Sequence, residues 1–452
     1  MLLCPLDYRY GRDEMKSIFT EENKLFSLMK VEASLAKAHA EVGNIPKEDA
    51  QRIEDVANLE KTSLDRVKEI EDETRHDIMA VVKAMTEMCG DSGKYVHYGA
   101  TSNDIIDTAT ALQLSQAMSI IAKDIDGLVI ALASQARKHE RTIMVGRTHG
   151  QFAIPITFGF KLAGYLAEML RHRERLQEAR KRVLVGKMSG AVGTGAALGE
   201  HFFDIQDLVM KDLGIGVEEA ATQIVGRDRY TELITLIASI CTSCQRYATE
   251  IRNLQRSEIQ EVMEAFDAEK QVGSSTMAHK KNPVLSENIC GLTRVVRAFV
   301  TPTYENMVLW HERDLTNSSA ERFILPHVMV LADDILDKTE RMFSSLVVRE
   351  ERMRTNLDSA KGLIMAEAVM IALVEKGMGR QVAHEVVRRA SMKADSSGTH
   401  LMDGLLDEKE VTSLMSEEEL GAIMDPENYV GKAPEIVKRQ VTRAELALGV
   451  KV

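Results

Sequence analysis

The chain has 452 residues, of which 44% are hydrophobic and 28% charged, a composition typical of a folded protein of two to four domains rather than a disordered one. Lys and Arg number 57 and Asp and Glu number 69, and the formal net charge of −12 argues against non-specific nucleic-acid binding. No stretch approaches the roughly 18 uncharged apolar residues of a membrane span, the N-terminus does not read as a signal peptide, and five cysteines are too few for a disulfide framework, so we expect a cytoplasmic protein.

Helical patterns dominate the sequence from one end to the other. Residues 1–100 predict shorter helices, with turns near Gly43 and Gly90. Residues 101–341 predict a block of long helices, and residues 342–452 predict a further helical region. Strand-like alternation is scarce and aromatic residues make up only 5% of the chain. The sequence therefore predicts an all-α protein.

The longest helices are expected over residues 104–139, 160–185 and 229–266. No proline occurs between positions 156 and 282, and a proline inside a helix would cost roughly 3 kcal/mol. Within 229–266 the apolar residues alternate in steps of four and three, a heptad-like seam, along a helix of about 55 Å. Helices of this length overreach one compact domain, so we expect a homo-oligomer rather than a monomeric bundle.

Small polar residues, histidines and cations gather in four clusters between the predicted helices, where functional residues are usually found. The clusters cover residues 74–77 with 97–104, residues 146–151, residues 272–283 and residues 310–322. Other motifs are missing: there is no Gly-rich nucleotide loop, no His-Glu-x-x-His, no Gly-x-Ser-x-Gly, and no second pair to make a zinc site with Cys241 and Cys244.

Each cluster has a functional and a structural interpretation. The stretch 272–283 suits a mobile loop that closes over an anion, or an exposed basic loop that caps the next helix. His149 suits proton transfer near neutral pH, or a helix cap. Thr101 and Ser102 suit the binding of phosphate or carboxylate oxygens, whereas Asp104 suits a cap. Arg313 and Arg322 suit a phosphate clamp, or a salt-bridged surface helix.

Taken together, these clusters resemble the fumarase/aspartase superfamily, whose members release fumarate from a succinyl carbon. The specific signature is residues 273–283, GSSTMAHKKNP. Within the superfamily, the chain resembles the adenylosuccinate lyase family over nearly its whole length. The family fold is three helical domains, here 1–100, 101–341 and 342–452, and the middle domain forms a twenty-helix bundle in a homotetramer whose active sites use residues from three chains.

The resemblance implies a β-elimination. Adenylosuccinate would give AMP and fumarate, and the succinyl-carboxamide ribotide of purine synthesis would be cleaved in the same way, without a metal or organic cofactor. A proton must leave a carbon beside a carboxylate, so the developing charge needs cations and hydrogen-bond donors. The departing nitrogen needs a proton as well.

The resemblance also implies the role of each catalytic residue. Ser274 would be the base that takes the Cβ proton, activated by Lys280 and by closure that excludes water. The residues alone do not distinguish Ser274 from the neighbouring Ser275, and the resemblance favours Ser274. His149 would be the acid that protonates the leaving nitrogen, with His76 supporting it and Glu287 orienting it.

Binding roles follow from the same resemblance. Lys280 and Asn282 would hold the succinyl carboxylates, assisted by Thr101 and Ser102. The nucleotide phosphate and its surroundings would be held by Arg9, Tyr10, Arg313, Ser318 and Arg322. Further substrate contacts are expected from Arg75, Asp77, His97, Gln223, Ser275, Lys281, Asn288 and Ser319.

The chain departs from the family pattern at Ala278, where proline is usual, and alanine should make the signature loop more flexible when it is empty. Two rival functions remain. A carboxymuconate-type cycloisomerase or another lyase of the superfamily would share the signature, but it would handle no phosphate, and Arg9, Arg313 and Arg322 argue against it. A non-catalytic scaffold would not need Ser274 and His149.

Overall fold

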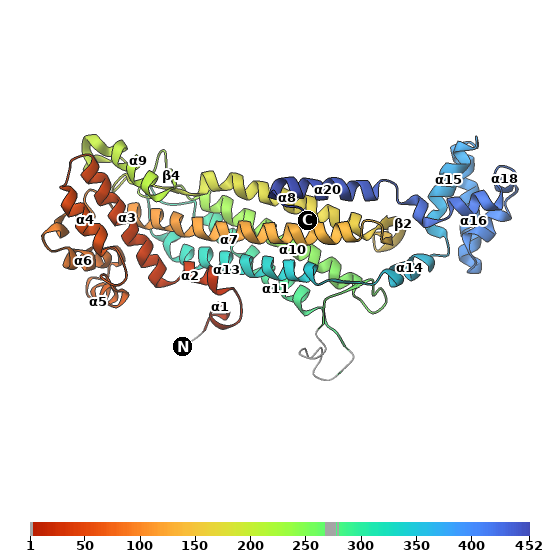
Figure 1. Cartoon of the computed structure of the whole chain (residues 1–452), viewed down its shortest axis with the longest axis horizontal. Helices are drawn as coiled ribbons and strands as arrows, with labels where there is room; N and C mark the ends of the chain where they lie inside the picture. Colours follow the sequence, from red (N-terminus) through yellow and green to blue (C-terminus); the bar gives the residue numbers. More distant parts are fainter. Residues whose placement is uncertain (1–2, 267–276, 278–279) are drawn as a thin grey trace. The chain divides into compact units, whose positions relative to one another are not determined.

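The computed structural model describes residues 3–266, Met277 and residues 280–452. These residues form two compact units, each assembled from three stretches of sequence. Unit 1 comprises Met1–Ile125, His172–Cys244 and Gly291–Asp337, and unit 2 comprises Asp126–Arg171, Gln245–Cys290 and Lys338–Val452. Only short strands accompany the helices, which confirms the all-α class (Figure 1). The division into domains 1–100, 101–341 and 342–452 stays a prediction.

Five helices contribute residues to both units: α7 (Ser102–Lys138), α8 (Phe158–Val183), α10 (Asp228–Leu254), α11 (Val284–Ala298) and α13 (Thr316–Ser344). Unit 1 further contains α1 (Pro5–Tyr8), α2 (Asp13–Ile18), α3 (Glu21–Glu41), α4 (Lys47–Val56), α5 (Leu64–Thr74), α6 (Asp77–Cys89), η1 (Gly90–Tyr95), β3 (Val185–Gly186), η2 (Ala196–His201), α9 (Phe202–Leu213), β4 (Gly216–Val217) and α12 (Val300–Glu305). Unit 2 further contains β1 (Ile143–Thr148), β2 (Gln151–Thr157), β5 (Val262–Met263), β6 (Val347–Val348), α14 (Glu350–Asp358), η3 (Leu363–Met365), α15 (Ala366–Glu375), α16 (Arg380–Ser397), α17 (Leu401–Leu406), α18 (Lys409–Thr412), α19 (Glu417–Ile423), η4 (Pro426–Tyr429) and α20 (Ala433–Leu448).

In unit 1, α3 packs against α4 and α9, and α5 pairs with α6 (Figure 1). Their shared core includes Met29, Leu35, Ile53, Met85 and Ile105, all of them buried. In unit 2, α16 packs against α15 and α17 around a second core, and β1 and β2 form an antiparallel hairpin. Each unit thus has a hydrophobic core of its own, and each carries part of the predicted site.

The predicted seam of the third long helix is fully buried within the chain, from Leu233 to Leu254. Its predicted end was wrong, because α10 stops at Leu254 rather than at residue 266. Beyond it, Gln260 has a left-handed φ of 56°, and Glu261 is buried where the helix would have continued. The Glu261 carboxylate accepts hydrogen bonds from Arg147, at 2.6 Å, and from the side-chain amide of Asn356 in α14, at 2.9 Å. The segment that follows the helix is therefore held by a partner more than a hundred residues away, which no local pattern predicts.

One proline lies inside a helix rather than at its end. Pro326 is in α13, where it has no N–H to donate to the carbonyl of Arg322 one turn earlier. It lines the cavity of unit 1 described below. No helix in the part of the chain that the structure describes is long and apolar enough to cross a membrane.

Candidate active site

His149 lies at the tip of the hairpin formed by β1 and β2. Thr148 pairs with Gln151, so His149 and Gly150 form a two-residue turn. Their φ values of 54° and 76° are both positive, as a type I′ turn requires, and glycine adopts this conformation without strain. Neither the pairing nor the strands were expected from the sequence, where His149 was placed between helices. The imidazole is exposed and makes no hydrogen bond or ion pair with any other described residue.

The hairpin is fixed close to its turn by a bidentate ion pair. Arg147 donates to both oxygens of the buried Glu261 carboxylate, at 2.6 and 2.9 Å. The guanidinium also lies over the Phe152 ring, 5.2 Å from its centroid. Paired, planar contacts of this kind restrict both partners, so the exposed histidine is carried on a rigid support.

A cleft of about 990 Å³ in unit 2 is lined in part by the described residues at the C-terminal end of the signature. Its lining includes Lys280, Lys281 and Asn282, together with Glu287 on the first turn of α11. The lining also contains three arginines, Arg252, Arg256 and Arg349. With the two lysines, five described cations therefore face one described carboxylate, that of Glu287. Such a cleft suits a ligand with two carboxylates. Ser274, Ser275 and Ala278 lie outside the described residues.

Glu264 joins the two described ends of the segment that contains the signature. Its buried carboxylate accepts hydrogen bonds from the backbone N–H groups of Leu285 and Ser286, at 3.0 and 2.7 Å, and from the Ser286 hydroxyl. It thus caps the start of α11, where a negative charge is favoured. Glu264 was not predicted, because an acidic cap supplied from 21 residues upstream has no local pattern in the sequence. The amide oxygen of Asn288, a predicted binding residue, accepts from Lys338 at 2.6 Å.

In unit 1, the predicted cluster at 74–77 lies between α5 and α6. Arg75 ends α5 with a left-handed φ of 56°, and His76 is the N-cap of α6. The Nδ1 atom of His76 accepts from the Met79 N–H at 3.3 Å, so in the neutral ring the proton is on Nε2. Asp77 accepts from Arg322 at 3.2 Å. The first cluster and the last one therefore meet.

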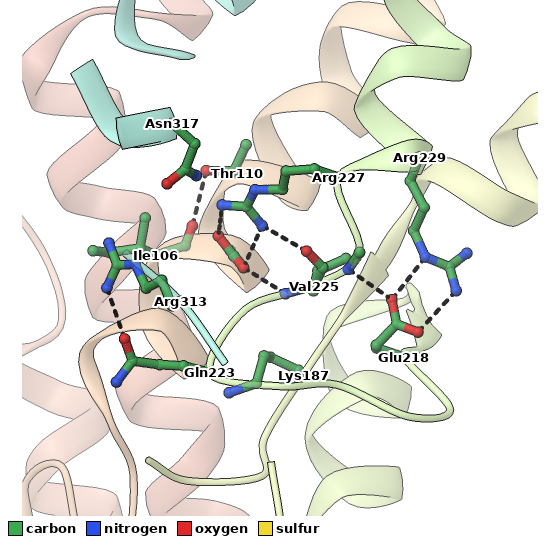
Figure 2. A network of polar contacts seen from close by, with 12 residues as sticks. Ile106, Thr110, Lys187, Glu218, Gln223, Val225, Arg227, Arg229, Arg313 and Asn317 are labelled. Atoms are coloured by element: carbon green, nitrogen blue, oxygen red, sulfur yellow. Dashed lines mark hydrogen bonds and ion pairs between the residues drawn. The ribbon is translucent and has the colours of Figure 1, made fainter. Parts of the chain in front are cut away.

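They meet at a cavity of about 220 Å³ in unit 1. Asp77, which was expected to contact substrate, lines it together with Arg313, Ser318 and Arg322, which were expected to hold a phosphate. Figure 2 shows Arg313 reaching Gln223, whose amide oxygen accepts from it at 3.0 Å. Gln223 was likewise predicted, so the structure brings five of the predicted residues together. Ser319 is exposed on α13 next to Ser318.

Three residues of the cavity lining form an ionic network that no pattern in the sequence predicted. Arg227 donates to both oxygens of Asp107, at 2.7 and 2.9 Å, and to Glu321 at 2.9 Å. Burial alone would lower the pKa of Arg227, but the two carboxylates outweigh it and raise that pKa. Figure 2 shows the same guanidinium bound to the carbonyl of Val225. No local motif joins these residues, whose positions span more than two hundred residues.

Thr101 and Ser102 lie at the start of α7, above a second buried ion pair. Asp104 caps the helix by accepting from the Thr101 N–H at 2.8 Å, as expected, but it also accepts from the N–H groups of Ser189 and Gly190. Its ionic partner is Lys187, and both side chains are fully buried. The pair therefore holds the backbone of the predicted binding residues against β3.

Replacing Lys187 by methionine should destabilise unit 1 by about 3–5 kcal/mol, because it leaves the Asp104 carboxylate buried without its cation. Urea denaturation followed by circular dichroism measures the change. The double variant Lys187→Met with Asp104→Asn should recover part of the loss, since it removes the stranded charge. A single variant as stable as the wild type would contradict the role of this pair.

His97 is also held by a carboxylate, that of Glu32 in α3. Its Nδ1 atom lies 2.7 Å from one carboxylate oxygen, and its backbone N–H donates to the other at 3.1 Å. These two contacts hold the backbone at a positive φ of 65°. Burial alone would lower the pKa of His97, but the hydrogen bond and charge of Glu32 raise it above the ordinary value. His97 is therefore an oriented, readily protonated group beside Thr101.

The segment with Arg9 and Tyr10 is tied to the long helices by Arg12. Arg12 donates to Asp333 in α13 at 3.0 Å and to Asp124 in α7 at 2.5 Å. Asp124 is buried, and its second oxygen has no hydrogen-bond partner among the described residues. Burial raises the pKa of Asp124 to about 7, with Arg12 opposing the rise and Asp333 adding to it.

Protonation of Asp124 should make stability depend on pH. The folded pKa exceeds the ordinary value of 3.8, so the folded protein holds this proton more tightly than the unfolded chain. The contribution of this proton to the free energy of unfolding is fully present below about pH 4 and is lost as the pH rises through about 7. We expect Asp124→Asn to reduce the fall in thermal midpoint between pH 5 and pH 8. An equal fall in both proteins would exclude Asp124 as its source.

The predicted residues thus fall into two groups, and the structure brings each group together within one unit. Unit 1 holds the cluster around Asp77 and Arg322, with Arg9 and Tyr10 on its N-terminal segment. Unit 2 holds His149 and the cleft with Lys280 and its neighbours. Within unit 2, Glu287 makes no described hydrogen bond or ion pair with His149, so the proposed orienting contact is not made within this chain.

Comparison with known families gives two matches along the chain. A family described as lyase matches residues 7–298, and one described as adenylosuccinate lyase C-terminus matches residues 362–440. The chain is 52% identical to an adenylosuccinate lyase of Pyrococcus horikoshii over 98% of both sequences. It is 47% identical to one of Methanocaldococcus jannaschii, covering 97% of this chain and 95% of that one.

Solved structures are similar over the same length. A fumarate lyase from a Mesorhizobium species superimposes with a TM-score of 0.88 and 34% identity, covering 97% of this chain and 98% of that one. A 3-carboxy-cis,cis-muconate lactonizing enzyme from Pseudomonas putida has a TM-score of 0.88 and 33% identity, covering 98% and 99%. The fold is therefore shared by enzymes with different substrates, whereas the higher sequence identities are to adenylosuccinate lyases.

Proposed function

Because the chain belongs to the adenylosuccinate lyases of the fumarase/aspartase superfamily, we propose that it cleaves adenylosuccinate to AMP and fumarate. The succinyl-carboxamide ribotide is its second substrate, cleaved by the same elimination. The observation that supports this most is the 52% identity over 98% of the sequence. The cavity of unit 1, which joins Arg313, Ser318 and Arg322, supplies the cations that a nucleotide phosphate needs.

In the proposed mechanism, the two ends of the substrate bind to different sets of residues. The phosphate binds in the cavity of unit 1, with Arg9 and Tyr10 completing it. The succinyl carboxylates bind to Lys280 and Asn282 of the basic cleft, whose five cations stabilise the charge that develops as the proton leaves. Ser274 removes the Cβ proton, the C–N bond breaks, and the electron pair remaining on nitrogen takes a proton from His149.

His76 supports the acid step through its free nitrogen. Its Nδ1 atom is committed to the Met79 N–H, so Nε2 carries the proton of the neutral ring and donates to substrate or to the acid. Glu287 orients His149 from a neighbouring subunit, because within one chain the two make no contact among the described residues. We therefore propose a homotetramer with active sites shared between chains, in the cytoplasm.

A cofactor-free assay tests the function directly. Purified protein is mixed with adenylosuccinate in the presence of a chelator, and fumarate and AMP are followed by NMR. Formation of both products in equal amounts is expected. No turnover by a folded, oligomeric protein would overturn the purine assignment, and argininosuccinate and carboxymuconate would then be tested as substrates of the related enzymes.

A further inference from the structure

Among the described residues, the lining of the cavity of unit 1 contains one lysine, Lys24, for which no role was predicted from the sequence. Lys24 lies in the first turn of α3 and shares the cavity with Asp77, Arg313 and Arg322. Its side chain is half-buried. Among the residues that the structure describes, it forms no hydrogen bond and no ion pair within 4.0 Å.

The other cations of the cavity are committed to partners. Arg227 is bound to Asp107 and Glu321, and Arg322 is bound to Asp77. Arg313 is bound only through Gln223, a neutral amide, and its buried Nε has no acceptor among the described residues. The carboxylates of the lining are therefore already engaged. Among the described cationic side chains of the lining, the Lys24 ammonium and the Arg313 Nε have no acceptor, and the neutral Asn103 amide nitrogen has none either.

An uncommitted ammonium in a half-buried position is costly unless a ligand accepts from it. Burial lowers the pKa of Lys24, and the nearby Arg322 lowers it further. Its own helix offers Glu21 and the facing elements offer Asp77 and Glu71, but none of these carboxylates lies within ion-pair distance. The cavity thus retains positive charge that an anion would neutralise.

We propose that Lys24 is a phosphate-binding residue of this cavity, donating to an oxygen of the nucleotide 5′-phosphate alongside Arg313 and Arg322. This inference rests on the proposed function and adds a residue to its binding site. A phosphate dianion has enough oxygens to accept from an ammonium, two guanidinium groups and the Ser318 hydroxyl together. The succinyl carboxylates have the separate basic cleft of unit 2.

Calorimetric titration of the full-length protein with AMP, adenosine and succinate tests the assignment. In Lys24→Met the dissociation constant of AMP should rise at least about tenfold, the effect of losing one hydrogen bond between charged groups. The constants for adenosine and for succinate, which lack the phosphate, should not change. Lys24→Arg should restore most of the AMP affinity, because it returns the cation.

Lys30→Met is the matched control, since Lys30 is an exposed lysine on the same helix and does not line the cavity. It should bind AMP like the wild type. AMP binding by Lys24→Met at wild-type affinity would overturn the assignment, as would equal losses for AMP and adenosine, or a loss confined to succinate. If the wild type bound no AMP, the proposed function itself would fail and the role of Lys24 with it.

Discussion

Replacing His149 by alanine should lower the turnover of adenylosuccinate by at least about 100-fold while leaving the fold intact, as expected for the loss of a general acid. The leaving nitrogen would then depart without a proton from the enzyme. The exposed turn that carries His149 has no role in either hydrophobic core, so circular dichroism and thermal melting should change little.

The geometry of the turn provides a better variant than alanine. His149 has a φ of 54°, which strains an alanine but suits asparagine, and Asn-Gly is a favoured sequence for a type I′ turn. His149→Asn therefore removes the imidazole and keeps the hairpin. Steady-state kinetics should show a fall of similar size in both variants. Near-normal turnover in His149→Asn would exclude His149 as the acid, and Gln151→Ala at the same tip serves as the control.

The long helices could be predicted because their periodicity is a local property of the sequence. The seam of α10 lies in steps of three and four, and every residue of it from Leu233 to Leu254 is buried. The same periodicity gave the wrong end for this helix, since the burial of Glu261 depends on Arg147. The hairpin of His149 was missed because its two strands, of six and seven residues, lie between two long helices and β2 runs directly into α8.

The candidate site was predictable where residue types cluster in sequence and not where the fold assembles them. Arg313 and Arg322 lie in one cluster, and the structure places both at one cavity. Lys24 lies in a run of polar and charged residues that is typical of an exposed helix face. Arg227 is followed by two further charged residues, Asp228 and Arg229. The importance of Arg227 arises from its ion pair with Asp107, and that of Lys24 from its place in the cavity lining near Arg322, and only the fold brings these groups close.

Replacing Ser274 by alanine should also lower turnover by at least about 100-fold, because no other group would take the Cβ proton. A serine hydroxyl is a weak base at neutral pH, so it must act as an alkoxide, and a neighbouring positive charge stabilises that form. The described end of the signature provides such charge, because Lys280 lines a cleft with four further described cations. AMP binding should survive in the variant, since the proposed phosphate site lies in unit 1.

Ser275→Ala separates the two adjacent serines. It should lose less activity than Ser274→Ala, because Ser275 is proposed to bind substrate rather than to remove a proton. Ser257→Ala is the control, an exposed serine in the lining of the same cleft with no proposed role. Full activity in Ser274→Ala with a large loss in Ser275→Ala would transfer the role of base to Ser275. Full activity in both would exclude a serine base, and the proton would then have to be taken by another group of the cleft, of which Glu287 is the described carboxylate.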